Sequence, residues 1–310
     1  MTDRLRPPPQ ERNVSELLSF GVLNLNKPAG PSAHQVAGWV RDLAGDAVEE
    51  FVEHGESETN GSLGVDRAAH AGTLDPKVTG CLPMLLGDAT RMAQVFLEGT
   101  KQYVAVLELH GPAPATFESI LEDFEGPIYQ KPPRKSAVSR RLRVREIHEL
   151  ALLEERDRQA LIRIRCESGT YIRKLCHDLG LALGTGAHMG HLRRTATDPF
   201  DDTSLVTLYE FIDALVFATE GDEAVLREVV DPAERALAHL PRVEIAPSAA
   251  RQVATGAPVY APGVISSDDA DEGQLVACYT PSGSAVCLGE MAGDVDADSG
   301  VAVDLVRVLV

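Results

Sequence analysis

Residues 160–184 read ALIRIRCESGTYIRKLCHDLGLALG and combine a strand pattern with a helix pattern. In residues 160–166 apolar side chains mix with Arg163 and Arg165 in the alternating pattern of a half-buried strand. After Gly169 the apolar residues recur every three or four positions, which predicts a helix with one apolar stripe. The stripe consists of Ile172, Leu175, Cys176 and Leu179. The segment therefore predicts a strand followed by a helix, as in a mixed α/β body.

The same two patterns extend toward the N-terminus. An alternating strand begins at Tyr103, and residues 21–30 read as a buried strand that ends in a Pro/Gly turn. Residues 32–45 have helical spacing with Ser32 as the N-cap. Residues 46–66 are acidic and are broken by Gly-containing dipeptides, so they predict a solvated insertion. The chain therefore predicts a mixed body of helices and strands.

The two ends of the chain differ from this body. From about Leu240 onward, short strands alternate with turns, which predicts a small β-rich domain that forms a compact barrel. Residues 1–15 are polar and proline-rich, so we expect a tail that is either disordered or held on another domain. The expected organisation is a tail at 1–20, a body at 21–239 and a C-terminal domain at 240–310.

The net charge of -18 argues against a nucleic-acid partner, because such proteins normally carry a basic surface. The distribution of the charge changes this conclusion. We expect the acidic residues to lie mostly in surface loops, at 46–58, 220–234, 268–272 and 294–298. Residues 130–145, in contrast, contain seven Lys or Arg and no acid, which predicts a basic arm. An acidic surface fits a saline cytoplasm, where the Debye length is roughly 3 Å near 1 M salt.

Several classes of protein are excluded by simple patterns. No run of 18 or more apolar residues is present, so we expect no membrane span. The N-terminus lacks the apolar core of a secretory signal, which predicts a cytoplasmic protein. The five cysteines form no C-x-x-C pair and lie in apolar segments, as buried free thiols do. The spacing of His70, His188 and His191 matches no zinc protease motif, so no metal is expected.

The densest group of reactive residues is HAGTLDPKVTGCLPMLLGDATR, residues 70–91. Asp75 lies there in a turn bracketed by Gly72 and Gly80, a setting that can hold a carboxylate rigidly. An Asp before Pro is more often a turn former than a catalytic group, and no second carboxylate lies nearby in sequence. Spacing alone therefore does not establish a function.

Three further residues have both a functional and a structural interpretation. Tyr171 and Arg173 are two positions apart, so on one helix they point in different directions unless the helix begins later. Tyr103 is either a stacking surface for a base or an aromatic of the core. The residues alone leave these alternatives open.

Six motifs in order resemble the TruB family of pseudouridine synthases. They are NKPAGPS, HAGTLDPKVTGCLP, KQYV, QKPPRKSAVSRRLRVREI, CESGTYIRKLCHDLG and GAHMGHLRR, all within residues 24–194. The sequences of the second and fourth motifs resemble those of the RNA-guided branch of the family, the archaeal counterparts of dyskerin. The C-terminal segment resembles the PUA RNA-binding domain. The resemblance implies an α+β fold, with a mixed-sheet catalytic domain and a small C-terminal β-barrel domain of PUA type.

The resemblance also implies roles for individual residues. Asp75 would attack the target uridine so that the glycosidic bond breaks, the base rotates and C5 is joined instead; whether the base or the sugar is attacked stays open. Arg173 would keep Asp75 ionised and oriented, and Lys27 and Pro28 would support the wall of the site. The implied substrate-binding residues are His70, Tyr103, Tyr171, Arg173 and Leu192. The implied phosphate contacts of the arm are Lys131, Arg134, Lys135, Arg140 and Arg141.

The expected partners follow from the same resemblance. We expect an H/ACA guide RNA, a substrate rRNA or tRNA, and small H/ACA accessory proteins. No cofactor is expected, because an isomerisation involves no net redox change or group transfer. Two alternatives are a stand-alone tRNA pseudouridine synthase that acts on the T-loop and a non-catalytic RNA scaffold. The sequence does not name the modified uridines, the guides or the oligomeric state.

Overall fold

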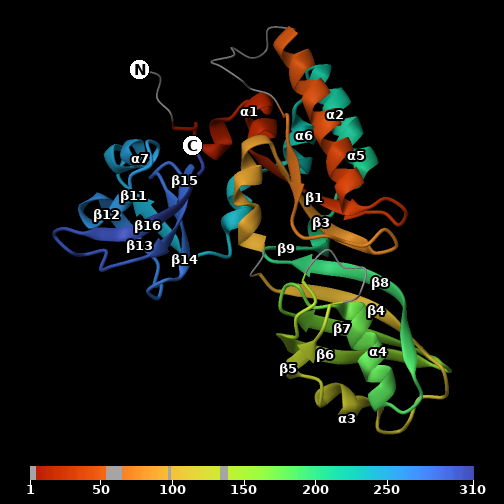
Figure 1. Ribbon diagram of the computed structural model, residues 1–310. Coiled ribbons are helices and arrows are strands. Elements are labelled where there is room, and N and C mark those ends of the chain that lie inside the picture. The colour runs from red at the N-terminus through yellow and green to blue at the C-terminus, as the bar shows by residue number, and fades with distance from the viewer. Residues whose placement is uncertain (1–4, 54–64, 97–98, 133–138) are drawn as a thin grey trace.

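The computed structural model describes residues 5–53, 65–96, 99–132 and 139–310, and these form two sheets with their covering helices (Figure 1). The larger sheet has ten strands in the order β10-β1-β3-β8-β4-β7-β6-β5, with β2 paired to β3 and β9 paired to β8. The smaller sheet has six strands in the order β12-β16-β15-β14-β11-β13. The predicted α+β fold, a mixed-sheet body with a small β-rich C-terminal domain, is confirmed.

The body is assembled from the following elements in chain order. They are η1 (Pro9–Glu11), α1 (Val14–Ser19), β1 (Gly21–Lys27), α2 (Ala33–Glu53), β2 (Ala68–His70), β3 (Thr79–Leu86), η2 (Gly87–Phe96), β4 (Lys101–Leu109), α3 (Phe117–Glu122), β5 (Gly126–Gln130), β6 (Arg143–Arg156), β7 (Gln159–Cys166), α4 (Ile172–Ala182), β8 (Ala187–Thr197), β9 (Phe200–Asp201), η3 (Asp202–Ser204), α5 (Leu208–Thr219), α6 (Ala224–Val229), β10 (Asp231–Pro232) and η4 (Ala233–Leu237).

The remaining elements build the smaller sheet. They are β11 (Arg242–Ile245), α7 (Pro247–Val253), β12 (Val259–Tyr260), η5 (Ala261–Gly263), β13 (Val264–Ser267), β14 (Leu275–Tyr279), β15 (Ala285–Met291) and β16 (Val301–Val308). This unit has its own core, which includes Val243, Ile245, Val276 and Val286. All five cysteines of the chain are free and buried, as their apolar surroundings predicted.

The large sheet consists of two halves joined by a short parallel contact. One half carries β1 and β3 with α2 and α5, and the other carries β4, β6 and β7 with α4 (Figure 1). The halves meet where Thr79 and Gly80 of β3 pair with Arg193 and Arg194 of β8. This junction lies next to the turn that contains Asp75, so the candidate catalytic residue is placed where the two halves join.

The N-terminal segment is held against the C-terminal domain in its described part. Arg6 donates from Nε to the carbonyl of Leu309 at 3.2 Å, and the Ser284 hydroxyl donates to the carbonyl of Pro7 at 3.0 Å. Arg12 is buried and makes a two-pronged contact with Glu234, which lies on η4 before the C-terminal domain. Residues 6–12 therefore contact both the C-terminal domain and η4.

The prediction of a solvated insertion at 46–66 is wrong for its first third. The helix α2 begins after Ser32, whose hydroxyl accepts from the backbone N–H of Gln35 as an N-cap does, and it continues to Glu53. Val48 and Phe51 are buried because they prolong the apolar stripe of the helix beyond the predicted end. Residues 54–64 of the expected insertion lie outside the described residues.

The acidic segments are also less uniform than expected. Residues 268–272 and 294–298 lie in loops, but residues 220–234 include α6, β10 and part of η4. Glu234 in that segment is only 11% exposed, because it is the partner of Arg12. Part of the acidic composition is therefore structural. No helix among the described residues is both long and apolar enough to cross a membrane.

Candidate active site

The turn that carries Asp75 lies between β2 and β3. Its two bracketing glycines have positive φ angles, +90° at Gly72 and +98° at Gly80, a conformation that favours glycine. The turn is closed by the backbone N–H of Val78, which donates to the carbonyl of Asp75 at 2.9 Å. The side chain of Asp75 is 52% exposed. The turn therefore presents a fixed carboxylate to solvent.

Lys27 holds this turn from beneath. Its buried ammonium group donates to the carbonyls of Pro28 at 2.8 Å, Pro76 at 3.1 Å and Val78 at 2.8 Å. Burial lowers the pKa of Lys27 below its usual value. The contacts agree with the expectation that Lys27 supports the wall of the site, because all three donors are used on the protein backbone.

Arg173 reaches Asp75 from the other half of the sheet. It lies in the first turn of α4, and its Nη2 contacts the Asp75 carboxylate. The pair is open to water, since the Arg173 side chain is 57% exposed. The helix begins at Ile172, with Tyr171 at the N-cap in an extended conformation. Tyr171 therefore precedes the helix. Tyr171 and Arg173 are then not two residues of one helix, and the expectation that they point in different directions does not apply.

Tyr171 is fixed by the strand that precedes the basic arm. The buried side chain of Gln130 at the end of β5 accepts from the Tyr171 backbone N–H at 2.8 Å and donates to the Tyr171 carbonyl at 3.2 Å. On the other side of the arm, Arg145 donates to Glu167 at 2.6 Å, and the backbone N–H of Glu146 donates to the same carboxylate at 3.1 Å. The strands that flank the arm, β5 and β6, thus both contact the turn that leads into α4.

The floor near the turn is formed by β4 and β8. Tyr103 lies opposite Arg194 in the pairing of these strands, and Leu192 lies opposite Ala105. Tyr103 is only 9% exposed, and Leu192 is partly buried against the main core. Burial raises the pKa of Tyr103, while the nearby charge of Arg194 opposes the rise. Tyr103 therefore has a core environment in this structure, at the edge of the candidate site.

His70 lies at the end of β2, just before the Asp75 turn. Its pKa is lowered by burial and by the positive charge of Arg194, with His34 also nearby. The buried Nδ1 of His70 has no hydrogen-bond partner among the described residues. Since a buried polar atom normally has a partner, His70 Nδ1 is an unsatisfied polar atom next to the Asp75 turn.

The basic arm is described only in part. Lys131, Arg140 and Arg141 are exposed, and Arg140 donates from Nε to the carbonyl of Pro132 at 3.0 Å. Arg134 and Lys135 lie outside the described residues. The predicted arm ends earlier than Arg145, because β6 begins at Arg143.

Two residues of the site were missed as candidates. Gln130 carried no signal, since a glutamine at a strand end has no distinctive spacing. Arg194 did carry one, because alternation along β8 puts it on the same face as Leu192. Its burial, with an exposed fraction of 1%, follows from that placement.

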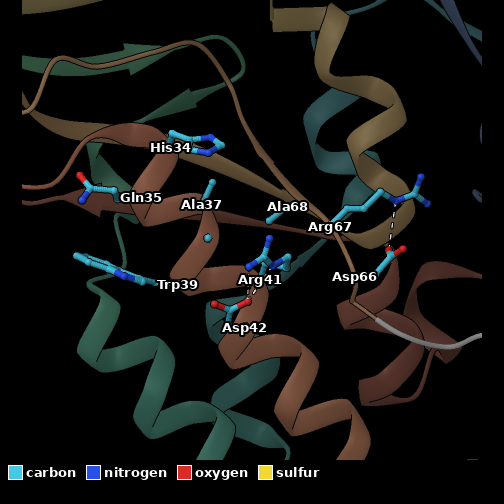
Figure 2. A pocket seen from close by; sticks show the side chains of 10 residues that line it. His34, Gln35, Ala37, Trp39, Arg41, Asp42, Asp66, Arg67 and Ala68 are labelled. Atoms are coloured by element: carbon cyan, nitrogen blue, oxygen red, sulfur yellow. Dashed lines mark hydrogen bonds and ion pairs between the residues drawn. The ribbon is translucent and has the colours of Figure 1, made fainter.

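A separate groove of about 470 Å³ lies along α2 and the start of β2 (Figure 2). It is lined in part by His34, Trp39, Arg41 and Arg67, and not by Asp75. Figure 2 shows Arg41 beside Asp42 and Arg67 beside Asp66. Because carboxylates match both arginines, the groove is no basic surface for phosphate. The described residues also contain no cluster of three or more His, Cys, Asp or Glu side chains suited to a metal ion.

Family models match four parts of the chain. The TruB family pseudouridylate synthase N-terminal domain matches residues 61–115, and the tRNA pseudouridylate synthase B C-terminal domain matches residues 173–238. The DKCLD domain matches residues 7–37, and the PUA domain matches residues 241–309.

Similar proteins cover nearly the whole chain. The probable tRNA pseudouridine synthase B of Haloarcula marismortui is 61% identical over 99% of this chain and 94% of its own length. The protein of that name from Halobacterium salinarum is 58% identical over 99% of both chains. Among solved structures, one in a Cbf5-Nop10-Gar1 complex has a TM-score of 0.87 and 38% identity, covering 100% of this chain and 91% of that chain. Another, in an H/ACA RNP bound to a substrate RNA, has a TM-score of 0.86 and 36% identity over 100% and 91% of the two chains.

Proposed function

The chain belongs to the TruB family of pseudouridine synthases, and we propose that Asp75 is the catalytic carboxylate of a guide-dependent enzyme. The observation that carries the proposal is the contact between Asp75 and Arg173. The Asp75–Arg173 contact joins the two halves of the sheet at a point open to solvent. Asp75 comes from the glycine-bracketed turn, and Arg173 comes from the start of α4. A bulky RNA nucleotide can reach a carboxylate held in this way.

The proposed reaction gives each nearby residue a distinct task. Arg173 keeps Asp75 ionised and oriented by a charge-assisted contact. Asp75 forms a bond to the uridine at the base or the sugar, and the glycosidic N1–C1′ bond breaks. The rotated base is joined to C1′ through C5 and the bond to Asp75 is released. The proton that leaves C5 is balanced by one taken up at N1. The target nucleotide is flipped out of its helix, because these atoms are not accessible together in a stacked base.

The walls of the proposed pocket hold the flipped base. Tyr103 stacks on one face of the base, and Tyr171 lies at another edge near the proton that leaves C5. His70 offers its unpartnered Nδ1 to the extruded nucleotide. Leu192 supplies the apolar side. Since Tyr103 is largely covered in this structure, stacking requires that its ring become more exposed when RNA binds.

We propose that the arm binds the phosphate backbone. The exposed Lys131, Arg140 and Arg141 are the described cations at its two ends. Arg134 and Lys135, which lie outside the described residues, extend the same charge. Phosphate contacts supply affinity with little dependence on base sequence, so these residues are assigned to binding rather than chemistry.

The proposed partners are an H/ACA guide RNA and small accessory proteins, with rRNA or tRNA as the substrate. Support comes from the DKCLD and PUA matches and from the similarity, over the whole chain, to proteins solved in a Cbf5-Nop10-Gar1 complex and in a substrate-bound H/ACA RNP. The C-terminal domain, residues 240–310, would anchor the guide RNA. Part of its surface is covered by the N-terminal segment through Arg6 and Pro7.

Reconstitution with a synthetic guide tests this proposal. The purified protein, accessory proteins and guide RNA should place pseudouridine at the guide-paired uridine, and a changed guide should move the modified position accordingly. A matched assembly with Asp75→Asn should give no product. If the wild-type protein modifies the same uridine regardless of guide, the guide-dependent proposal is wrong.

A second candidate is a stand-alone enzyme acting on tRNA, which the name of the haloarchaeal relatives favours. Bare tRNA incubated with the protein alone separates the two. A rate on bare tRNA equal to the rate of the assembled particle on its guided target would favour the stand-alone enzyme. The third hypothesis, a non-catalytic scaffold, predicts no pseudouridine either in the reconstituted particle or on bare tRNA.

We also infer that the protein works in the cytoplasm. The five cysteines are free and buried, which suits a reducing compartment. The acidic composition suits a saline cytoplasm, and the relatives in Haloarcula and Halobacterium share most of this sequence. Fractionation of cells that express a tagged copy, with RNA binding measured at molar salt, tests both statements.

A further inference from the structure

We propose that Arg194 is a positioning residue that fixes the Asp75 turn and the Tyr103 ring as one unit. The inference rests on the proposed role of Asp75. Arg194 does not contact the Asp75 carboxylate itself and acts through the turn that carries it. It is carried by the burial of Arg194, by the two backbone carbonyls that its guanidinium contacts, and by its place opposite Tyr103.

The guanidinium of Arg194 binds the backbone on both sides of the Asp75 turn. Its Nε donates to the carbonyl of Cys81 at 2.7 Å, just after the turn, and its Nη2 donates to the carbonyl of Gly72 at 3.2 Å, just before it. The planar group holds these two donors in a fixed geometry. One side chain therefore sets the separation of the two ends of the turn.

The backbone of Arg194 restrains the same turn. An added Cβ at Gly80 would lie 2.2 Å from the carbonyl oxygen of Arg194, and one at Gly72 would lie 3.4 Å from its Nη1. Gly80 also pairs with Arg194 where β3 meets β8. The two bracketing glycines are thus each in close contact with Arg194, one with its main chain and one with its side chain.

Arg194 extends this restraint to the proposed stacking residue. Tyr103 on β4 is its direct cross-strand neighbour, so the two side chains lie on one face of the sheet. Burial raises the pKa of Tyr103, and the charge of Arg194 opposes that rise. Arg194 therefore contacts both the turn that carries the Asp75 carboxylate and the strand neighbour Tyr103, whose ring is proposed to stack on the base.

The charge environment of Arg194 argues against a purely space-filling role. Arg194 is 1% exposed, and it takes part in none of the ion pairs that join described residues. Lys101, another buried cation, is close enough for the Arg194 charge to add to the burial that lowers its pKa. Burial of a cation without an ion-pair partner is unfavourable for stability. An apolar side chain would fill the space without this penalty but would lose both carbonyl contacts.

The test compares Arg194→Met and Arg194→Lys with the neighbouring Arg193→Met. Arg193 lies on the opposite face of β8 and donates to the Asn26 side chain at 3.1 Å, so it controls for loss of one arginine from the same strand. Single-turnover rate and RNA dissociation constant are measured for each protein in the assembled particle. Because misplacement of reactive groups lowers rates steeply, Arg194→Met should be slower by about 100-fold with RNA affinity changed less than about 3-fold.

Rescue by the conservative variant is the second readout. Lysine keeps one donor and the charge, so Arg194→Lys should recover part of the rate, while Arg193→Met should stay near wild type. If the folded fraction of Arg194→Met falls and its rate per folded molecule does not, Arg194 acts only on stability and the proposal is wrong. If Arg194→Met does not fold, Arg194→Lys decides: an unchanged rate overturns the proposal, and a slower rate at unchanged affinity supports it.

The same experiment separates this inference from the proposed function. Product from Asp75→Asn would remove the role of Asp75 itself. Loss of product in Asp75→Asn together with wild-type rates in both Arg194 variants would leave that role intact and remove only the positioning role of Arg194.

Discussion

Two arginine–carboxylate pairs in this molecule have opposite surroundings. Arg12 and Glu234 form a two-pronged contact, with distances of 2.8 and 2.6 Å, and their side chains are 1% and 11% exposed. Arg173 and Asp75 form a contact in which both side chains are more than half exposed. The first pair joins the N-terminal segment to η4, and the second joins the two halves of the large sheet.

The comparison shows that burial decides what such a pair does. An exposed pair contributes at most about 1 kcal/mol to stability, because water screens the charges, but its carboxylate stays accessible to a substrate. A buried pair is inaccessible, and loss of one partner leaves an uncompensated charge. Glu234 also accepts from the backbone N–H of Ala285 at 3.1 Å, so the buried pair extends into the C-terminal domain. The exposed pair therefore suits the chemistry that we propose for Asp75, and the buried pair suits the assembly of the chain.

The largest expected effect is on the exposed pair, through Asp75→Asn. The amide keeps the shape of the side chain but loses the charge and the nucleophilic oxygen, so the single-turnover rate should fall by at least about a thousand-fold. The midpoint of thermal unfolding and the RNA affinity should stay near wild type, because the pair is screened and phosphate contacts dominate binding.

Two measurements make this prediction decisive. Quantification of pseudouridine after one turnover gives the rate, and binding titrations with the guide-bound target give the affinity. Appreciable product from Asp75→Asn would remove the assignment of the nucleophile. A large loss of stability would instead break the comparison, since an exposed pair would then behave as a buried one.

Local patterns in the sequence were enough to locate much of the fold around this site. The strand from Tyr103, the strand before Gly169 and the helix after it were predicted from periodicity and correspond to β4, β7 and α4. The strand β3 was missed, because it is nearly fully buried in the centre of the sheet and shows no alternation. The end of α2 was also missed, since acidic residues conceal the apolar stripe there.

The site was predictable only where a motif marks it. Asp75 and Arg173 were singled out by resemblance, and periodicity could not show that they meet. Arg12 and Glu234 are 222 positions apart, and nothing local distinguishes a buried arginine from a solvated one. Contacts of this kind depend on how the chain returns on itself, which a single sequence does not reveal.

The second prediction concerns the buried pair. Arg12→Met leaves Glu234 with an unpaired charge at a position that is 11% exposed, so the free energy of unfolding should fall by about 3 to 5 kcal/mol. Denaturant titration measures the change. At a temperature where the variant is still folded, its rate per folded molecule should remain close to that of the wild type.

A matched control is Arg227→Met, which removes an arginine that donates to the Arg12 carbonyl but whose own carboxylate partner, Glu223, is exposed. Its effect on stability should be much smaller. Equal losses in the two variants would contradict the claim that burial of the pair is what matters.

The third prediction returns to the exposed pair through Arg173→Lys. An ammonium group keeps the charge but not the planar set of donors, so one charge-assisted contact of about 1.5 to 3 kcal/mol is weakened. If this is fully expressed in the transition state, the single-turnover rate falls roughly 10- to 150-fold. A rate equal to that of wild type would show that charge alone, without geometry, is sufficient at Asp75.

The smallest effect is expected at Lys101, a buried cation whose ammonium donates to the carbonyl of Phe96 at 3.0 Å rather than to a carboxylate. Burial, together with the charge of Arg194, lowers its pKa from 10.5 to about 8. The folded protein therefore binds this proton less tightly than the unfolded chain, and stability should rise as the pH increases from about 8 to about 10.5. Buried thiols act in the opposite direction, since burial raises the pKa of Cys81 from 9.0 to about 11. Wild type and Lys101→Met share these thiols, so the contribution of the thiols cancels in the difference between the two unfolding free energies. This difference should change by about 1 to 2 kcal/mol over the accessible part of the pH range from about 8 to about 10.5. If the difference does not vary with pH, burial does not lower the pKa of Lys101. That result would contradict the claim, drawn from the comparison of the two arginine pairs, that burial makes an unpaired charge unfavourable.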